Sequence, residues 1–257
     1  MRRAWRLAFC AAVLGLSPAP VSAGQVTALY QAYWAGLPAG EIRLTLDDDG
    51  GGYRDQIAIR TEGLPRLVTR FQGDATSEGR FGAPQPTPLR YEAHYDLRKG
   101  RNRRLSMHFA GRAGAVVAER GPADTSKKPP LAERFRTNVL DPLSALSAIR
   151  DHLRHGERGE FLVPVYDGAR RFDVRVTVLP THGGDGPLQL QLTLAPIAGF
   201  KGETSDDGDP DNAPRPVALT MSDDPQLLPL SMKVTLYYMP LVVQLSRRCD
   251  AAASCPW

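Results

Sequence analysis

The residues best suited to chemistry lie together in one short segment, residues 151–157. His152 and His155 are three residues apart, with Asp151 and Glu157 beside them, and on a helix this spacing makes the two imidazoles neighbours. Imidazole and carboxylate groups bind zinc, but a zinc site needs at least three protein ligands. Two histidines without a third ligand are an incomplete site, and cationic groups here also suit the C-terminal end of a helix dipole. The sequence therefore predicts no metal ion and no other cofactor.

Nucleophilic catalysis has no recognisable motif in this sequence. No G-x-S-x-G is present, so the turn that exposes a serine above a hydrolase sheet is missing, and Ser144 and Ser147 have no evident base. The glycine-rich segment 47–53 lacks the Lys-Ser/Thr of a phosphate loop and predicts a tight hairpin. We expect no catalytic residues. The alternative is a hydrolase with an unrecognised site, which needs a cleft that joins a nucleophile or carboxylate to one of the five histidines.

Positive charge is concentrated in the segment RKGRNRR, which contains Arg98, Lys99, Arg101, Arg103 and Arg104. At a hairpin tip these side chains could contact an anionic partner, such as phospholipid headgroups, lipopolysaccharide phosphates or an acidic protein. The alternative is a solvated loop with some cross-strand ion pairs. Aromatic residues do not alternate with the basic ones, so no nucleic-acid partner is expected.

Two of the three cysteines, Cys249 and Cys255, are six residues apart near the C-terminus. Their spacing is not C-x-x-C and no histidine is close to them, so a redox or metal site is disfavoured. In an oxidising compartment a disulfide is the favoured interpretation. Because the enclosed loop is short, the bond would hold the tail, residues 249–257, rather than stabilise the whole fold.

The N-terminal residues 1–23 predict a secretory signal peptide and hence a periplasmic protein. Three arginines precede an apolar run over residues 7–16, and Val21-Ser22-Ala23 resembles a cleavage site. The apolar run is too short to span a bilayer, and no later run is long enough, so no transmembrane segment is expected in the mature chain. Of 32 basic and 28 acidic residues, removal of the three arginines leaves 29 basic ones, which weakens any general case for nucleic-acid binding.

Period-two alternation runs through most of the mature chain and predicts strands with one buried face. The apolar sets are Ile42/Leu44/Leu46, Phe172/Val174/Val176/Val178, Leu188/Leu190/Leu192/Leu194 and Leu230/Met232/Val234/Leu236. We expect a mainly β fold, a curved antiparallel sheet or open β-barrel with one packed α-helix. Residues 24–248 are expected to form a single domain of this kind.

One hairpin can be predicted in more detail, between residues 91–97 and 105–109. Both apolar sets are odd-numbered, which favours an odd-length loop centred near Gly100 over a two-residue turn. In that register Tyr91 faces Phe109 and Tyr95 faces Leu105. On the opposite face, Asp96 meets Arg104 and Glu92 meets His108, so that both faces agree with the pairing.

The helix is predicted to begin at the segment DPLSALSAIRDHLRHG. Asp141 suits the cap position, Pro142 the first helical turn and Gly156 the left-handed exit. An apolar stripe follows helical spacing through Leu143, Leu146, Ile149 or Arg150, and Leu153. One side of this helix should therefore pack on the sheet.

Four segments of the chain resemble a family of exported bacterial proteins, domain of unknown function 3108. They are residues 30–41 (YQAYWAGLPAGE), 141–150 (DPLSALSAIR), 165–176 (VYDGARRFDVRV) and 219–234 (LTMSDDPQLLPLSMKV). These motifs are turns, a helix cap and strand patterns, and the resemblance implies no catalytic residue. An acidic segment over residues 201–216 and the cysteine tail depart from the family pattern.

A curved sheet with a helix on its concave side can enclose an apolar cavity. We therefore expect a non-catalytic periplasmic protein that binds a lipid or another apolar envelope component. One alternative is that the leucines and valines only fill a core. A second is an envelope interaction protein that contacts anionic surfaces through the arginine-rich hairpin tip.

Overall fold

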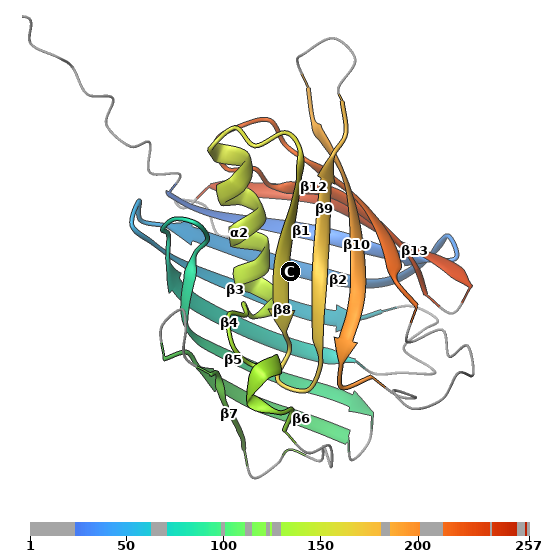
Figure 1. Ribbon diagram of the computed structural model, residues 1–257. Helices are drawn as coiled ribbons and strands as arrows, with labels where there is room; N and C mark the ends of the chain where they lie inside the picture. The colour runs from blue at the N-terminus through green and yellow to red at the C-terminus, as the bar shows by residue number, and fades with distance from the viewer. Residues whose placement is uncertain are drawn as a thin grey trace, which may run out of the picture.

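The alternating segments of the sequence form one curved antiparallel sheet (Figure 1). The computed structural model describes residues 24–62, 71–98, 101–110, 115–121, 124, 130–180, 186–200, 213–236, 238–250 and 255. Within these residues, thirteen strands lie in the order β7-β6-β5-β4-β3-β2-β1-β13-β12-β11-β10-β9-β8. The predicted fold class is confirmed. The predicted signal peptide, residues 1–23, lies outside the described residues.

The elements follow one another along the chain mostly as antiparallel neighbours. The strands are β1 (Gly24–Trp34), β2 (Leu37–Asp48), β3 (Gly52–Thr61), β4 (Gln72–Arg80), β5 (Thr87–Arg98), β6 (Arg101–His108), β7 (Val117–Arg120), β8 (Glu160–Tyr166), β9 (Arg171–Val178), β10 (Leu188–Ala198), β11 (Arg215–Met221), β12 (Pro229–Leu236) and β13 (Met239–Asp250). Between β7 and β8 lie a short 3-10 turn, η1 (Glu133–Phe135), and the helix α2 (Pro142–Arg154). None of the helices in the described part of the chain has the length and apolarity needed to span a lipid bilayer.

The sheet does not close on itself, because its two edge strands, β7 and β8, are not paired with each other. The segment before α2 bonds to β8 and to the residues that come just before β7. On one side, Val116 donates its backbone amide to the Arg136 carbonyl at 2.9 Å. On the other, Leu140 forms a parallel bridge with Val165 of β8. This segment therefore covers part of the β8 edge and pairs with the chain just before β7.

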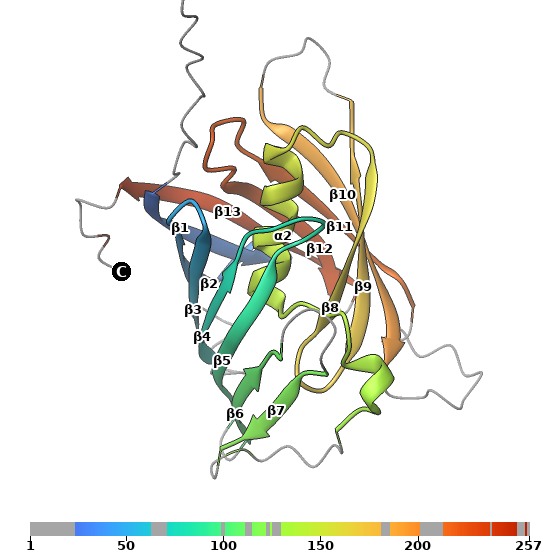
Figure 2. The same cartoon turned by 60° about the vertical axis from the view of Figure 1, so that its left-hand side comes forward.

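The helix α2 lies between the two halves of the curved sheet (Figure 2). Asp141 is its N-cap, Pro142 its first residue, and Gly156 has a left-handed φ of 82° just past its end. The predicted start and exit of the helix are therefore confirmed. Of the predicted apolar stripe, Leu143, Ile149 and Leu153 are buried and Leu146 is half-buried.

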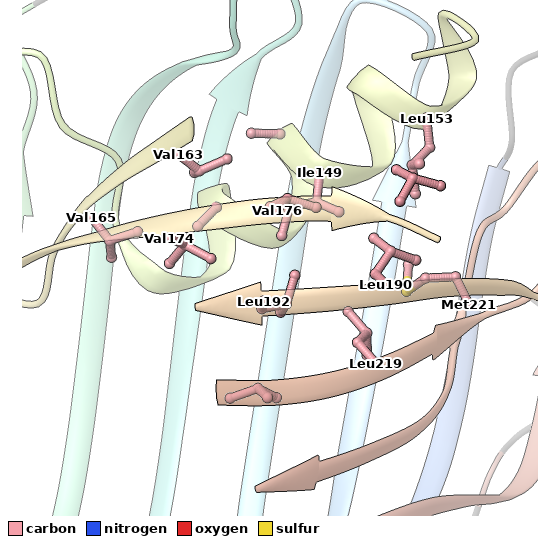
Figure 3. Close-up of a cluster of buried hydrophobic side chains, with 14 of the residues drawn as sticks. Ile149, Leu153, Val163, Val165, Val174, Val176, Leu190, Leu192, Leu219 and Met221 are labelled. Atoms are coloured by element: carbon pink, nitrogen blue, oxygen red, sulfur yellow. The ribbon is translucent and has the colours of Figure 1, made fainter. Parts of the chain in front are cut away.

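Two apolar clusters fill the space around α2. In the first, Ile149 and Leu153 of the helix meet inward-facing side chains of β8, β9, β10 and β11, as Figure 3 shows. In the second, Leu143 packs with residues of β1, β2, β5 and β6, among them Leu46 and Met107. The helix therefore contributes apolar side chains to both halves of the interior.

The predicted register of the hairpin β5–β6 is wrong by two residues, although the predicted faces are right. Tyr91 pairs with Met107 rather than Phe109, and Ala93 pairs with Leu105. A register shift between Asp96 and Arg98 brings Arg98 opposite Arg101. Beyond this bulge, the numbers of opposed residues have an odd sum instead of an even one. The even sum was the reason for expecting an odd-length loop, so a two-residue turn is no longer disfavoured.

Candidate functional site

A second side of α2, rich in polar residues, is also buried and faces β3 and β4. The carboxylate of Asp141 caps the helix by accepting the backbone amides of Leu143 at 3.0 Å and Ser144 at 2.9 Å. Its other oxygen accepts the hydroxyls of Ser144, and of Ser77 from β4 at 2.9 Å. The Ser144 hydroxyl also lies 2.6 Å from the phenol oxygen of Tyr53 on β3. The start of α2 is thus bound to the sheet through hydrogen bonds.

One turn further along the helix, Ser147 donates a hydrogen bond to Oδ2 of Asp55 on β3. Asp55 is fully buried, and its Oδ1 has no hydrogen-bond partner among the described residues. Burial raises the pKa of this carboxyl to about 7, against the opposing effects of the Ser147 hydroxyl and the Arg150 charge. Asp55 is therefore a buried acid that exchanges its proton near neutral pH.

Near its C-terminal end, α2 is held by a buried ion pair. The guanidinium of Arg150 donates to both carboxylate oxygens of Asp48 on β2, at 2.8 and 3.3 Å, and its Nε donates to the Gln226 carbonyl at 3.0 Å. Arg154 donates to the same carboxylate from a partly exposed position. Burial lowers the pKa of Arg150, and the Asp48 charge opposes that change. We refer to the contacts made by Asp141, Ser144, Ser147 and Arg150 as the polar seam.

The interior is filled unevenly along the strands. Inward-facing side chains are buried where α2 lies and half-buried at the end marked by the β1–β2 and β12–β13 hairpins. On β2 the change occurs between Leu44 and Ile42, and on β10 between Leu192 and Leu194. Ile57 on β3 is also half-buried. We call this end, which α2 does not fill, the open end.

A pocket of about 140 Å³ lies at the open end. Its lining is mostly apolar and is formed by Phe172, Leu194, Pro196, Phe200 and Ala213. Two charged residues, Arg170 and Arg215, complete the lining. The Arg170 guanidinium bonds to Asp167 and lies 5.5 Å from the centre of the Phe200 ring. The pocket therefore combines an apolar wall with two arginines, of which Arg170 is paired with Asp167.

A second cleft, of about 650 Å³, lies at the C-terminal end of α2 and contains the histidines singled out in the sequence. His152 contacts the Glu157 carboxylate at 2.7 Å, and His155 lies 3.6 Å from that of Asp151. Within the described residues, no group of three or more side chains is arranged to hold a metal ion. The cleft joins carboxylates to histidines, but no serine, threonine or cysteine lines it among the described residues. A hydrolase site stays a prediction.

The arginine-rich tip is described only in part. Arg103 donates to the Asp167 carbonyl at 2.8 Å, and Arg104 bonds to the Asp96 carboxylate at 2.8 Å, as predicted for the opposite face of the hairpin. Lys99 and the side chains of Arg98 and Arg101 lie outside the described residues. Contact of this tip with an anionic surface stays a prediction, and at least two of its five cations bond to other residues of the protein.

The two C-terminal cysteines are joined as the sequence predicts, in a disulfide between Cys249 and Cys255. Cys249 lies in β13 opposite Thr27 of β1. The carbonyl of Cys255 accepts a hydrogen bond from Arg43 on β2. The disulfide and this hydrogen bond hold Cys255 against the neighbouring strands.

Comparison with known proteins supports the fold and leaves the activity open. The chain is similar to a protein described as a beta-barrel-like protein of domain of unknown function DUF1849 from Brucella abortus, with a TM-score of 0.55 to its crystal structure. The identity is 12%, over 89% of this chain and 98% of that one, so the likeness concerns the fold alone. No curated protein matches the sequence. A family model described as "Protein of unknown function (DUF3108)" matches residues 29–182.

Proposed function

Because the chain belongs to the DUF3108 family, whose description names no activity, we propose a function from its geometry: the protein binds a lipid or another apolar envelope component at the open end. The observation that carries this proposal is the half-buried state of inward-facing apolar side chains such as Ile42, Ile57 and Leu194. Removing apolar surface from water contributes roughly 25 cal/mol per Å². A ligand with an apolar chain would gain this free energy by covering these side chains.

We assign one end of such a ligand to the small pocket. Phe172, Leu194 and Pro196 give it an apolar wall, while Arg170 and Arg215 place positive charge beside that wall. Ligand sites combine a mostly apolar lining with a few polar groups that orient the ligand. An amphiphile with an anionic group, such as a fatty acid or a phospholipid, matches this combination. At about 140 Å³ the pocket holds only part of such a molecule, and the rest would lie along the open end.

A periplasmic location is part of the same proposal. The basic and apolar pattern of residues 1–23 supports export, and the Cys249–Cys255 disulfide suits an oxidising compartment. The envelope is also where lipids and other apolar components need a protein to cover them in water. The protein and its ligand would then share one compartment.

Native mass spectrometry of protein recovered from the periplasm tests the proposal directly, since a bound lipid adds a defined mass. Delipidated protein is then titrated with cis-parinaric acid, a fluorescent fatty acid. We expect saturable binding, weakened by Leu194→Gln. The matched control is Leu162→Gln, because Leu162 is 52% exposed on β8 and alternates with the inward-facing Val163. Finding only the apo mass, together with no saturable binding by wild type, would contradict the proposal.

A further inference from the structure

Two neighbouring hairpin tips at the open end carry large exposed apolar side chains. The β1–β2 tip presents Trp34 and Leu37, which are 38% and 49% exposed. The β12–β13 tip presents Tyr238 and Met239, which are 90% and 46% exposed. The tips are in contact, because the Ala35 amide donates to the Pro240 carbonyl at 2.9 Å. The four side chains therefore lie on two adjoining hairpin tips, and we call this part of the surface the apolar edge.

The composition of these tips differs from that of three other hairpin tips, although the β4–β5 tip, residues 81–86, also lacks a charged side chain. The β2–β3 tip is built from Asp49 and glycines, the β5–β6 tip contains Arg98 and Arg101, and the β8–β9 tip contains Asp167 and Arg170. In contrast, residues 33–40 and 236–241 contain no charged side chain. Large contiguous apolar patches are rare on soluble proteins, and many of those that occur are interaction sites.

Two residues of these tips have strained backbone conformations. Ala35 has a φ of 52° and Tyr238 a φ of 66°, which place both residues in the left-handed region that non-glycine residues rarely adopt. Glycine would adopt either conformation without strain. The Tyr238 side chain is almost fully exposed. Strained residues of this kind cluster at functional sites.

The apolar edge is also continuous with the interior. Trp34 pairs with both Leu37 and Leu241, and directly opposed residues share a face of the sheet. Leu241 in turn pairs with Val234, which is buried inside. The side of the edge that carries Trp34 and Leu37 is therefore the side that faces the open end.

We propose that the apolar edge seats the protein on a phospholipid bilayer, with the open end against the lipid. Tryptophan and tyrosine prefer the membrane interface, where the ring is buried and its polar atom stays hydrated. Insertion of Trp34, Leu37, Tyr238 and Met239 would transfer no charged side chain of either tip out of water. This inference rests on the proposed function. With the open end against the bilayer, a lipid could enter or leave it without crossing water.

Trp34 offers a direct probe of this contact. The chain has three tryptophans; Trp5 lies in the predicted signal peptide, so Trp257→Phe leaves Trp34 as the sole tryptophan of the mature protein. With vesicles of phosphatidylethanolamine and phosphatidylglycerol, we expect the Trp34 emission to shift to shorter wavelength. We also expect lipids brominated in their chains to quench it. An unshifted, unquenched emission overturns the proposal.

Sedimentation with the same vesicles tests which residues make the membrane contact. Tyr238→Ser with Met239→Ser should weaken binding about tenfold or more, because two large apolar side chains no longer insert. The control, Val117→Ser with Leu162→Ser, removes two side chains that are 51% and 52% exposed elsewhere and should bind as wild type does. Binding that both variants retain and that salt abolishes would place the contact at the arginine-rich tip and overturn the proposal. Self-association through the edge without vesicle binding would also overturn it.

Titration of the same variants with cis-parinaric acid separates this proposal from the proposed function. The Tyr238 and Met239 variant should still bind the fatty acid, because neither residue lines the pocket. Vesicle binding without fatty-acid binding in the wild-type protein would contradict the proposed function and leave the edge standing. Fatty-acid binding without vesicle binding would contradict the membrane contact of the apolar edge and leave the proposed function standing.

Discussion

Ser147 donates a hydrogen bond to Asp55, and neither side chain reaches solvent. This contact joins α2 to β3 between two others, the Asp141–Ser77 bond at the start of the helix and the Arg150–Asp48 pair near its end. Apolar packing is non-directional, whereas hydrogen bonds require particular distances and angles. The polar seam therefore sets the position of α2 along the sheet, and with it the length of interior that remains as the open end.

The first prediction concerns the pH dependence of stability. The Asp55 pKa is about 7 in the folded protein and about 3.9 in an unfolded chain. Between these values the folded state binds more protons, so this group makes the free energy of unfolding fall as pH rises from about 4 to 7. Asp55→Asn removes the effect. From pH 5 to pH 8, we expect wild type to lose on the order of 2 kcal/mol relative to this variant in urea unfolding.

The matched control for Asp55 is the exposed Asp223. Asp223→Asn makes the same chemical change at the surface and should follow the wild-type dependence on pH. Parallel curves for wild type and Asp55→Asn would show that the Asp55 proton does not contribute to stability in this range.

The second prediction concerns the buried pair of Arg150 and Asp48. Removing one partner of such a pair leaves a buried charge and costs about 3–5 kcal/mol. Because Arg154 also bonds to Asp48, we expect Arg150→Met to lower the free energy of unfolding by about 3 kcal/mol, the lower end of that range. Combining it with Asp48→Asn should restore part of the loss. Arg175→Met, which breaks the exposed pair with Glu160, should change stability by at most about 1 kcal/mol. Equal losses for the two arginine variants would contradict this account.

The sheet and helix could be predicted from the sequence because their signals are local. Alternation of Ile42, Leu44 and Leu46 defines a strand whatever its partner, and Asp141 followed by Pro142 defines a helix start. The hairpin register could not be obtained in the same way. A bulge between Asp96 and Arg98 changed the pairing without changing the alternation on either strand.

The polar seam was missed because it joins residues far apart in sequence. Ser144, Ser147 and Arg150 recur at three-residue spacing on α2, but such a stripe on its own predicts a solvated face. The sequence held a second indication in Asp55. It alternates with the outward residues of β3 and so shares the inward face with Tyr53 and Ile57. A carboxylate at an inward strand position needs a buried partner. Two polar stripes, one on the helix and one on the strands, together indicate that these surfaces meet.

The third prediction is an energetic coupling between Tyr53 and Ser144, whose oxygens lie 2.6 Å apart. In a double-mutant cycle of Tyr53→Phe and Ser144→Ala, we expect a coupling energy of about 1 kcal/mol, typical of one buried hydrogen bond. Combining Tyr53→Phe with Ser246→Ala should be additive within about 0.5 kcal/mol, because Ser246 bonds to the Leu29 carbonyl on another part of the sheet. Additivity in both cycles would show that the hydroxyl contact contributes no stability.

The fourth prediction separates the disulfide from the core. A disulfide that closes so short a loop stabilises a protein by about 2 kcal/mol at most in the chain-entropy description. Cys249 is also held by strand pairing, opposite Thr27 of β1. We therefore expect Cys249→Ser with Cys255→Ser to keep a single cooperative urea transition with a small shift of its midpoint. Wild type in a reducing agent should behave in the same way. Loss of the cooperative transition in either case would mean that the bond holds β13 in the sheet, and that the C-terminal tail is part of the folding unit.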